Sequence, residues 1–401
     1  MANIQTVSDS FQCSACGACN VVCAKNAIDF DWSTMGRKYA KVDSDKCTNC
    51  GLCVKVCPSL DYLQLDSKYQ DKYIGDIIKV YVGRATEEKL FNNGQSGGVC
   101  TALITHLFDT HKIDAAVVVM MNIGNSPHVK GVLITKKEDL IYSQKSCYTP
   151  VDLLSTLKEN LKDYSSIAVV GLPCHLHGLT ALMQTNRKFN NIKYKIGLVC
   201  DRTLGKTIQD VMAALANIYG MPYKIEWRKK NFQYHGQQYF YNNAPVTLLN
   251  GEGHVIGVLS KNARMVLKDF FTVPKCRSCT DKINIHADIV CGDPHRMPDV
   301  DMIKGSSVIA TRTEIGENLI QECINNRIIC VEERPVNQFI SGQLIEERKK
   351  NKNINNKIVI DKFIDRENHS KEDNVRYAKR ILESKYSYLS KIKILIKKII
   401  K

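Results

Sequence analysis

Eight cysteines near the N-terminus repeat one spacing, C-x2-C-x2-C-x3-C, in two runs. A peptide with this spacing wraps a cubane iron–sulfur cluster, because three neighbouring thiolates bind one cluster and the fourth reaches across to the other. The sequence therefore predicts two [4Fe-4S] clusters. The first would be ligated by Cys13, Cys16, Cys19 and Cys57, and the second by Cys47, Cys50, Cys53 and Cys23.

Zinc ligation and disulfide bonds are the alternative uses of these cysteines. Zinc sites usually come as separated pairs, whereas these are two tandem runs with Pro58 directly after the last cysteine. Disulfides are disfavoured because the first residues, MANIQTVSDSFQ, lack the apolar segment of an export signal. We therefore expect the protein in the reducing cytoplasm.

A further four cysteines stand at or near the ends of predicted strands. Cys174 follows one strand in GLPCHLHGL, Cys200 ends another, and Cys276 and Cys279 form a C-x2-C pair. Singly, each could be a small buried side chain, half of a zinc site or a redox thiol. Together they predict a third cubane cluster, with zinc as the alternative. The other cysteines have no ligand spacing and are expected mostly in the core: Cys100, Cys147, Cys291, Cys323 and Cys330.

Strands alternate with helices after residue 77, which predicts a mostly parallel sheet with helices on its faces. In such an α/β domain, ligands bind at the carboxyl ends of the strands. Residues 232–260 are expected to form a β-rich insertion with a turn at Asn250-Gly251, covering the substrate pocket. The expected strands are 78–85, 114–121, 130–135, 165–171 and 193–201, and the expected helices are 100–108, 150–161, 175–185 and 204–220.

Composition narrows the function classes. The 401 residues, 44% of them hydrophobic, can form two or three domains with cores of their own. No apolar run approaches the roughly 18 residues that span a bilayer. The net charge is +15, but we find no nucleic-acid-binding module, so we expect no nucleic acid partner. A basic surface would also attract an acidic redox partner or coenzyme.

The glycine-rich loop FNNGQSGGVCTAL precedes a predicted helix. Its main-chain amide groups and the helix N-terminus could bind a phosphate, although a plain turn explains it equally well. Its spacing is that of neither a Walker loop nor a dinucleotide fingerprint. The two histidines beside the inner cysteine turn, His175 and His177, are expected to be structural hydrogen-bonding groups rather than catalytic ones.

Four motifs in order resemble the family of beta subunits of coenzyme F(420)-reducing hydrogenase and dehydrogenase. They are SGGVCTAL at 96–103, Gly-x-Pro-Cys at 171–174, Cys200 after an apolar strand, and C-x2-C-x-D…ADI-x2-GD at 276–293. The resemblance covers roughly residues 77–345, with a two-cluster ferredoxin domain in front. It implies a flavoprotein that binds FAD beside a cubane cluster. Such a protein passes electrons between a hydride carrier, the deazaflavin coenzyme F(420) or a similar one, and iron–sulfur partners.

The resemblance also implies site residues. The inner cluster would again be held by Cys174, Cys200, Cys276 and Cys279. The implied cofactor contacts are Ser96, Gly97, Gly98, Ser146, Tyr148, Gly171 and Pro173.

The chain departs from the family's pattern around the predicted flavin. Cys147 stands where the family tends to have lysine, Pro294-His295 replaces an aromatic residue, and Asp201-Arg202 replaces His-Gly. The alternative function is therefore a flavin-free electron-transfer adaptor that is membrane-associated and linked to polysaccharide synthesis.

The predicted organisation has three parts. A small α+β bacterial-type ferredoxin domain occupies 1–66, and a polar linker leads to a flavin and iron–sulfur oxidoreductase domain at 77–345, with parts 77–165 and 166–345. A basic helical tail follows at 346–401. Its last segment, YLSKIKILIKKIIK, has an apolar face and a lysine face. This pattern is typical of a helix on the inner face of an anionic membrane, or equally of a helix docked on the protein.

Overall fold

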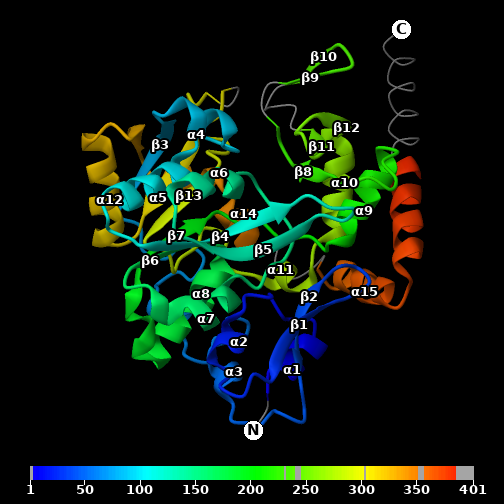
Figure 1. Cartoon of the computed structure of the whole chain (residues 1–401), viewed down its shortest axis with the longest axis horizontal. Helices are drawn as coiled ribbons and strands as arrows, with labels where there is room; N and C mark the ends of the chain where they lie inside the picture. The colour runs from blue at the N-terminus through cyan, green and yellow to red at the C-terminus, as the bar shows by residue number, and fades with distance from the viewer. Residues whose placement is uncertain (1–2, 230–231, 240–244, 302–303, 351–355, 385–401) are drawn as a thin grey trace.

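The computed structural model describes residues 3–229, 232–239, 245–301, 304–350 and 356–384. A small cysteine-rich module (residues 3–66) lies at one end of a larger α/β body, next to α8 (Figure 1). The module contains an antiparallel pair of strands joined at the expected turn, where Gly36 has φ +78°. A Cβ on Gly36 would lie 2.2 Å from the Lys206 nitrogen, so the turn packs directly on the body. The elements of the module are α1 (Gln5–Asp9), α2 (Ala18–Val22), β1 (Ile28–Trp32), β2 (Lys38–Val42), α3 (Leu52–Lys55) and η1 (Asp66–Lys68).

The body is built on an eight-stranded mixed sheet in the order β15-β3-β14-β13-β7-β6-β4-β5. The α/β class is confirmed, and the four central strands β13, β7, β6 and β4 are parallel as expected. The expectation of a mostly parallel sheet is wrong for the margins, where the pairs are antiparallel. Between β4 and β5 the connection is a short hairpin, which joins only antiparallel strands. The strands are β3 (Lys79–Ala85), β4 (Ala115–Asn122), β5 (His128–Ile134), β6 (Ile167–Gly171), β7 (Ile192–Leu198), β13 (Ile289–Gly292), β14 (Ser307–Thr311) and β15 (Ile329–Arg334).

Helices cover both faces of this sheet, which explains why the central strands are apolar throughout. One hydrophobic core lies under α5 and α12, and the other lies under α8 and extends into the cysteine-rich module. The expected helix 150–161 is wrong in its first part. Asp152 has a non-helical backbone, and a 3₁₀ turn precedes a single short helix. These elements are α4 (Glu88–Asn93), α5 (Val99–Asp109), η2 (Lys137–Asp139), α6 (Leu140–Ser143), η3 (Leu153–Thr156), α7 (Leu157–Asn160), η4 (Leu161–Asp163), α8 (Pro173–Thr185), η5 (Arg187–Asn191) and α12 (Glu314–Asn325).

The expected β-rich insertion is present between the body's strands β7 and β13. It contains a three-stranded antiparallel sheet, β12-β11-β8, and a separate hairpin of β9 and β10. The turn at Asn250-Gly251 is confirmed, since the Asn250 nitrogen donates a hydrogen bond to the His254 carbonyl at 3.0 Å. The elements of this region are α9 (Thr207–Leu215), β8 (Lys224–Glu226), β9 (Phe232–Tyr234), β10 (Gln237–Tyr239), β11 (Val246–Leu249), β12 (Val255–Leu259), α10 (Lys261–Phe271) and α11 (Pro274–Ser278).

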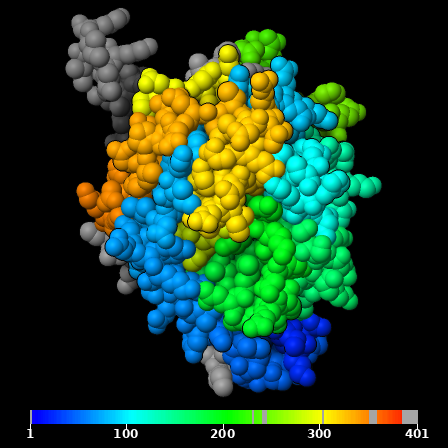
Figure 2. Space-filling view, turned by 90° about the vertical axis from the view of Figure 1, so that its left-hand side faces the viewer, coloured from blue at the N-terminus to red at the C-terminus, as the bar shows by residue number. Residues whose placement is uncertain are grey.

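The polar stretch after the module, expected to be a linker, is fastened to the body. Tyr69 donates a hydrogen bond to the Ile285 carbonyl at 3.1 Å, and Arg312 donates to the carbonyls of Ile74 and Asp76 at 2.9 and 2.6 Å. Figure 2 shows blue chain continuing from the module at the bottom up the surface of the body. Because its carbonyl groups are held by a buried arginine, this stretch does not behave as a free tether.

The C-terminal part is helical in α13 (Val336–Gly342), α14 (Ile345–Lys350), α15 (Asn356–Glu367) and at 371–384. Glu367 accepts a hydrogen bond from the Ser33 hydroxyl at 2.6 Å and pairs with Arg37 at 3.5 Å, so α15 is docked against the cysteine-rich module. The predicted amphipathic helix YLSKIKILIKKIIK lies outside the described residues. Within the part of the chain that is described, no helix is both long and apolar enough to cross a membrane.

Candidate functional site

The first predicted set of cysteines meets around one small cavity. Cys13, Cys16, Cys19 and Cys57 line it, with Phe30 among the residues that close it. Burial, followed by the neighbouring thiols, raises the pKa of Cys16 to about 12. Burial also raises the pKa of Cys19 and of Cys57, so these thiols keep their protons unless a metal takes their place. This donor set fits a [4Fe-4S] cluster.

Main-chain geometry explains the spacing of both cysteine runs. Gly17 and Gly51 have φ of +96° and +79°, and each starts the short helix that carries the next cysteine. A side chain on Gly17 would also meet the Ser155 nitrogen at 2.6 Å. Amide groups point to sulfur atoms, as from Ala15 to the Cys13 Sγ and from Ala27 to the Cys23 Sγ, each at 3.4 Å. Such N–H···S contacts support bound thiolates.

The second set lies closer to solvent. Burial raises the pKa of Cys53, and the nearby Cys50 raises it further. Cys50 is exposed, and Asn3 lies beside Cys47 with its Nδ2 atom 3.8 Å from the Sγ atom. A cluster held here with Cys23 would be the one nearest to the surface.

The inner cysteines converge at the carboxyl edge of the parallel strands. Cys174 is the second residue of α8, shortly after β6, and Cys200 follows β7, the parallel neighbour of β6. Burial raises the pKa of Cys174, and so do the thiols of Cys16, Cys200, Cys276 and Cys279. The four predicted ligands therefore lie close enough together for their thiolate charges to repel one another. Their role as ligands of a third cluster remains a prediction that this donor set fits.

Close packing links the inner cysteines to the first cavity. A Cβ on Gly178 would lie 3.3 Å from the Cys16 Sγ and 3.1 Å from the Ala18 Cβ. Cys174 lies four residues before Gly178 in α8, and therefore on the same face of that helix. The glycine lets α2 approach α8, so the sulfur atoms of the two sets become neighbours.

Basic side chains surround the inner set. Asp201, next to Cys200, pairs with Lys268 and Arg202 at 2.8 Å each. Burial alone would raise the pKa of Asp201, but these cations hold it far below its usual range. Arg348 donates a hydrogen bond to the Cys279 carbonyl at 3.1 Å. Such charges offset the negative charge of four thiolates.

Two of the predicted flavin contacts meet at a buried ion pair. Asp293, directly after β13, accepts a hydrogen bond from Ser96 and pairs with Arg228. The Nη2 atom of Arg228 lies 3.5 Å from the Ser146 hydroxyl. Burial raises the pKa of Asp293, but Arg228, His295 and Ser96 together hold the pKa below its usual value.

Tyr148 contributes an aromatic ring to one side of this site. Its ring packs edge-on against Trp227 with centroids 4.9 Å apart. The hydroxyl groups, the guanidinium and the half-buried ring together fit a flat cofactor with an anionic group. The flavin contacts themselves remain a prediction.

The other predicted flavin positions have structural roles of their own. A Cβ on Gly97 would meet the Gly83 carbonyl at 2.5 Å, and Gly98, with φ +75°, starts α5. Gly171 accepts a hydrogen bond from the Asn284 amide at 2.9 Å, and Pro173 is the first residue of α8. Their local packing explains these residues without a ligand.

His175 is a structural residue, as expected. Its Nδ1 accepts a hydrogen bond from the Leu172 nitrogen at 3.2 Å, and its Nε2 lies 3.1 Å from the Val151 carbonyl. Burial lowers its pKa to about 4. The ring is therefore neutral in the folded protein at neutral pH.

A pH dependence follows from His175. Between pH 6.5 and 4 the unfolded chain binds a proton that the folded chain does not, so stability falls as the pH is lowered. When the pH is lowered from 7.5 to 5.5, the free energy of unfolding should fall by about 1 kcal/mol more in the wild type than in His175→Gln, because the folded pKa of His175 is about 4. Anaerobic urea titrations followed by tryptophan fluorescence would measure this. His111→Gln, at an exposed position, is the control for replacing a histidine as such. Equal slopes for all three proteins would contradict the assignment.

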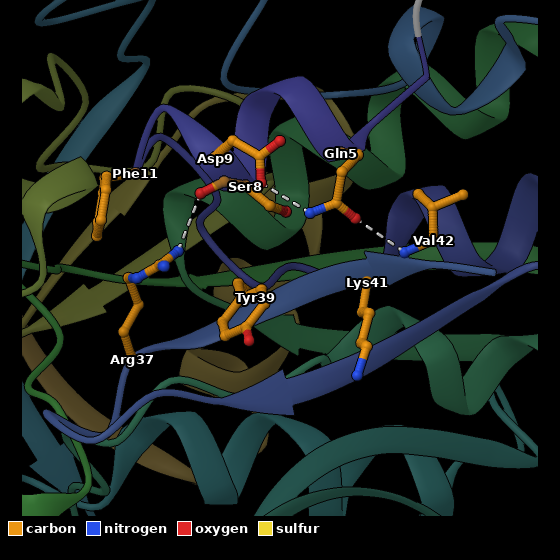
Figure 3. A pocket seen from close by; sticks show the side chains of 8 residues that line it. All are labelled: Gln5, Ser8, Asp9, Phe11, Arg37, Tyr39, Lys41 and Val42. Carbon is orange, nitrogen blue, oxygen red and sulfur yellow. Dashed lines mark hydrogen bonds between the residues drawn. The ribbon is translucent and has the colours of Figure 1, made fainter. Parts of the chain in front are cut away.

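A separate surface pocket of about 530 Å³ lies on the cysteine-rich module, between α1 and β2 (Figure 3). Arg37 packs against the rings of Phe11 and Tyr39, 4.5 and 4.6 Å from their centroids, and donates a hydrogen bond to the Ser8 carbonyl at 3.3 Å. None of the predicted cofactor contacts or cluster ligands lines it. The pocket is lined by Gln5, Ser8, Asp9, Phe11, Arg37, Tyr39, Lys41 and Val42.

Comparison with known families agrees with this arrangement. Residues 80–158 and 164–336 match the N-terminal and C-terminal parts of the coenzyme F(420) hydrogenase/dehydrogenase beta subunit. Residues 12–60 match a 4Fe-4S dicluster domain. The chain belongs to the family of coenzyme F(420) hydrogenase/dehydrogenase beta subunits. It is an iron–sulfur oxidoreductase, as predicted.

Individual relatives of this beta-subunit protein are distant. It is 28% identical to a subunit of the F(420)H(2) dehydrogenase of Methanosarcina mazei, over 84% of this chain and 89% of that one. It is also 28% identical to the coenzyme F(420)-dependent sulfite reductase of Methanocaldococcus jannaschii, over 79% of this chain and only 46% of the reductase. A chain in the F(420)-reducing [NiFe] hydrogenase complex of Methanosarcina barkeri shares the fold. The TM-score is 0.52 and the identity 21%, over 74% of this chain and 92% of that one.

Several residues beside the predicted flavin contacts were not identified from the sequence. Asp293 lies in the Gly-Asp pair of a motif that was already evident, so it could have been selected. Arg228 and Trp227 come from the insertion and have no local pattern that marks them. Their position beside Ser146 and Tyr148 arises only from folding.

Proposed function

We propose that this protein passes electrons between coenzyme F(420), or a similar hydride carrier, and iron–sulfur partners through FAD and three [4Fe-4S] clusters. The observation that carries the proposal is the position of Cys174. It follows the strand end where cofactors bind in α/β sheets, and its thiol is in electrostatic range of Cys16 in the module. One continuous path therefore runs from the carboxyl edge of the sheet into the cysteine-rich module.

The residues of the chain have distinct tasks in this proposal. Arg228 and Ser146 would bind an anionic part of the cofactor, and Tyr148 would contact its ring system. Asp293 orients Arg228, and the packing of α2 on α8 excludes water between the inner cysteines and the first cavity. Bound FAD supplies the ability to accept electrons as a pair and release them singly.

The substrate assignment rests on the relatives. The relatives in M. mazei and M. jannaschii are both named for coenzyme F(420), and the net charge of +15 favours an acidic coenzyme. The partner assignment rests on Cys50 of the second cysteine set, because this residue is exposed to solvent where a redox protein could dock. The relative in M. mazei is itself named as a subunit.

Anaerobic cofactor analysis tests the proposal. The purified protein should contain about one flavin and about twelve irons per chain, and reduced F(420) should bleach both flavin and cluster absorption. Reproducible absence of flavin after reconstitution would overturn it. That result would support a flavin-free adaptor, which the packing roles of Gly97 and Gly98 and the presence of Cys147 favour.

A further inference from the structure

Two buried histidines and two half-buried aspartates form a cluster that contains none of the predicted cysteine ligands. His177 comes from α8, His286 from the loop before β13, and Asp61 and Asp66 from the end of the cysteine-rich module. The two histidines are 8% and 4% exposed. Three stretches that are distant in the sequence therefore meet where the module joins the body.

The side-chain atoms are spaced as metal ligands are. The His286 Nε2 and the His177 Nδ1 lie 3.0 and 3.5 Å from the same Asp66 carboxylate oxygen. One ligand atom from each of these residues lies within 4.8 Å of the other two. Ligands bound to zinc at about 2.0–2.1 Å in a tetrahedron lie about 3.4 Å apart. Movements of about an ångström would be enough to bring all three onto one ion.

Hydrogen bonding shows why a cation is needed there. The Nε2 of His177 lies 3.1 Å from the Asp61 Oδ1, and a carboxylate can only accept, so this nitrogen carries the proton. In the neutral ring, Nδ1 then carries no proton, and it lies 3.5 Å from an oxygen of the Asp66 carboxylate, which is also an acceptor. Two acceptors at 3.5 Å repel each other unless a positive charge lies near them.

A second proton on His177 is an unfavourable way to supply that charge. Burial lowers its pKa, and the neighbouring His286 lowers it further. The two rings are tilted by 38° to each other with centroids 4.4 Å apart, so a second proton on His177 would place a positive charge directly beside the other imidazole ring. A metal ion avoids this, because it binds neutral imidazole.

We propose that Asp66, His177 and His286 bind one divalent transition-metal ion, for which Zn²⁺ is a fitting occupant. Asp61 holds the far nitrogen of His177 and so orients this ligand, an arrangement common around zinc-bound histidines. Two histidines and one carboxylate leave a fourth position for water. The ion joins the end of the cysteine-rich module to α8 and the loop before β13. The site is independent of the proposed electron transfer, which stands whether or not zinc binds.

The wild-type holoprotein provides the first test. After anaerobic equilibration with excess Zn²⁺ and removal of loosely bound metal, we expect about one zinc per chain. The zinc K-edge absorption spectrum should show nitrogen and oxygen ligands at about 2.0–2.1 Å and no sulfur at about 2.3 Å. Absence of retained zinc, or a sulfur shell, would overturn the proposal without any variant having to fold.

Matched variants provide the second test. His286→Gln should lose the zinc, whereas His106→Gln should retain it. His106 is also buried and lies 3.0 Å from an acidic partner, Glu322, but belongs to no group of three possible ligands among the described residues. The variant Cys276→Ser/Cys279→Ser should retain the zinc as well, which separates this site from the inner cysteines. Zinc retained by His286→Gln would overturn the proposal.

Discussion

Replacing Cys276 and Cys279 together by serine should remove about four of some twelve irons per chain. Both thiols lie in electrostatic range of Cys174 and Cys200, so the variant leaves only two of the four predicted ligands. If the proposed function holds, electron transfer from reduced F(420) to an iron–sulfur partner should fall to background, since Cys174 of this set is the thiol that interacts with Cys16 of the module. Flavin content should stay close to that of the wild type.

Iron, acid-labile sulfide and zinc measured on the same sample decide the outcome. Cys330→Ser is a suitable control, because this cysteine is exposed on β15 and has no predicted ligand role. The control should retain all iron and sulfide. An unchanged iron content in the double variant would refute the third cluster. Loss of one sulfur-bound zinc would instead assign the zinc alternative to these four cysteines.

Arg228→Met should strongly impair both stability and cofactor binding. The change leaves the Asp293 carboxylate buried without its main cation, and removing one partner of a buried pair destabilises by about 3–5 kcal/mol. The pKa of Asp293 should rise, because Arg228 is the largest of the contributions that lower it. Urea unfolding and flavin content, measured anaerobically on the same preparation, would give the two effects.

The double variant Arg228→Met/Asp293→Asn separates the two effects. Neutralising Asp293 removes the unpaired buried charge, so most of the lost unfolding free energy should return. Flavin binding should not return, because the guanidinium beside Ser146 is still absent. Full flavin content in both variants would contradict the role of Arg228 in cofactor binding. A single variant as stable as the wild type would contradict the importance of the ion pair.

The local features of this protein could be predicted from the order of its residues. The cysteine spacing suffices for the first cluster sets because a short peptide with that spacing can wrap a cubane in only a few ways. The alternation of apolar strands with amphipathic helices likewise predicts the α/β class, since each apolar segment needs a covering layer. Most expected strands and helices occur close to their predicted bounds.

Contacts between residues that lie far apart in the sequence could be identified only from the folded structure. The antiparallel pairs at the β15 side of the sheet follow from how β3, β14 and β15 pair, and no local pattern encodes their neighbours. Asp66 and His286 meet across 220 residues, and Arg228 meets Asp293 across 65. Such pairs leave no periodicity in the sequence, because their distance depends on the packing of whole elements. The cysteine-rich runs thus predict iron–sulfur chemistry by themselves, whereas the predicted flavin contacts and the proposed metal site come together only once α8 and the ends of β6, β7 and β13 are assembled.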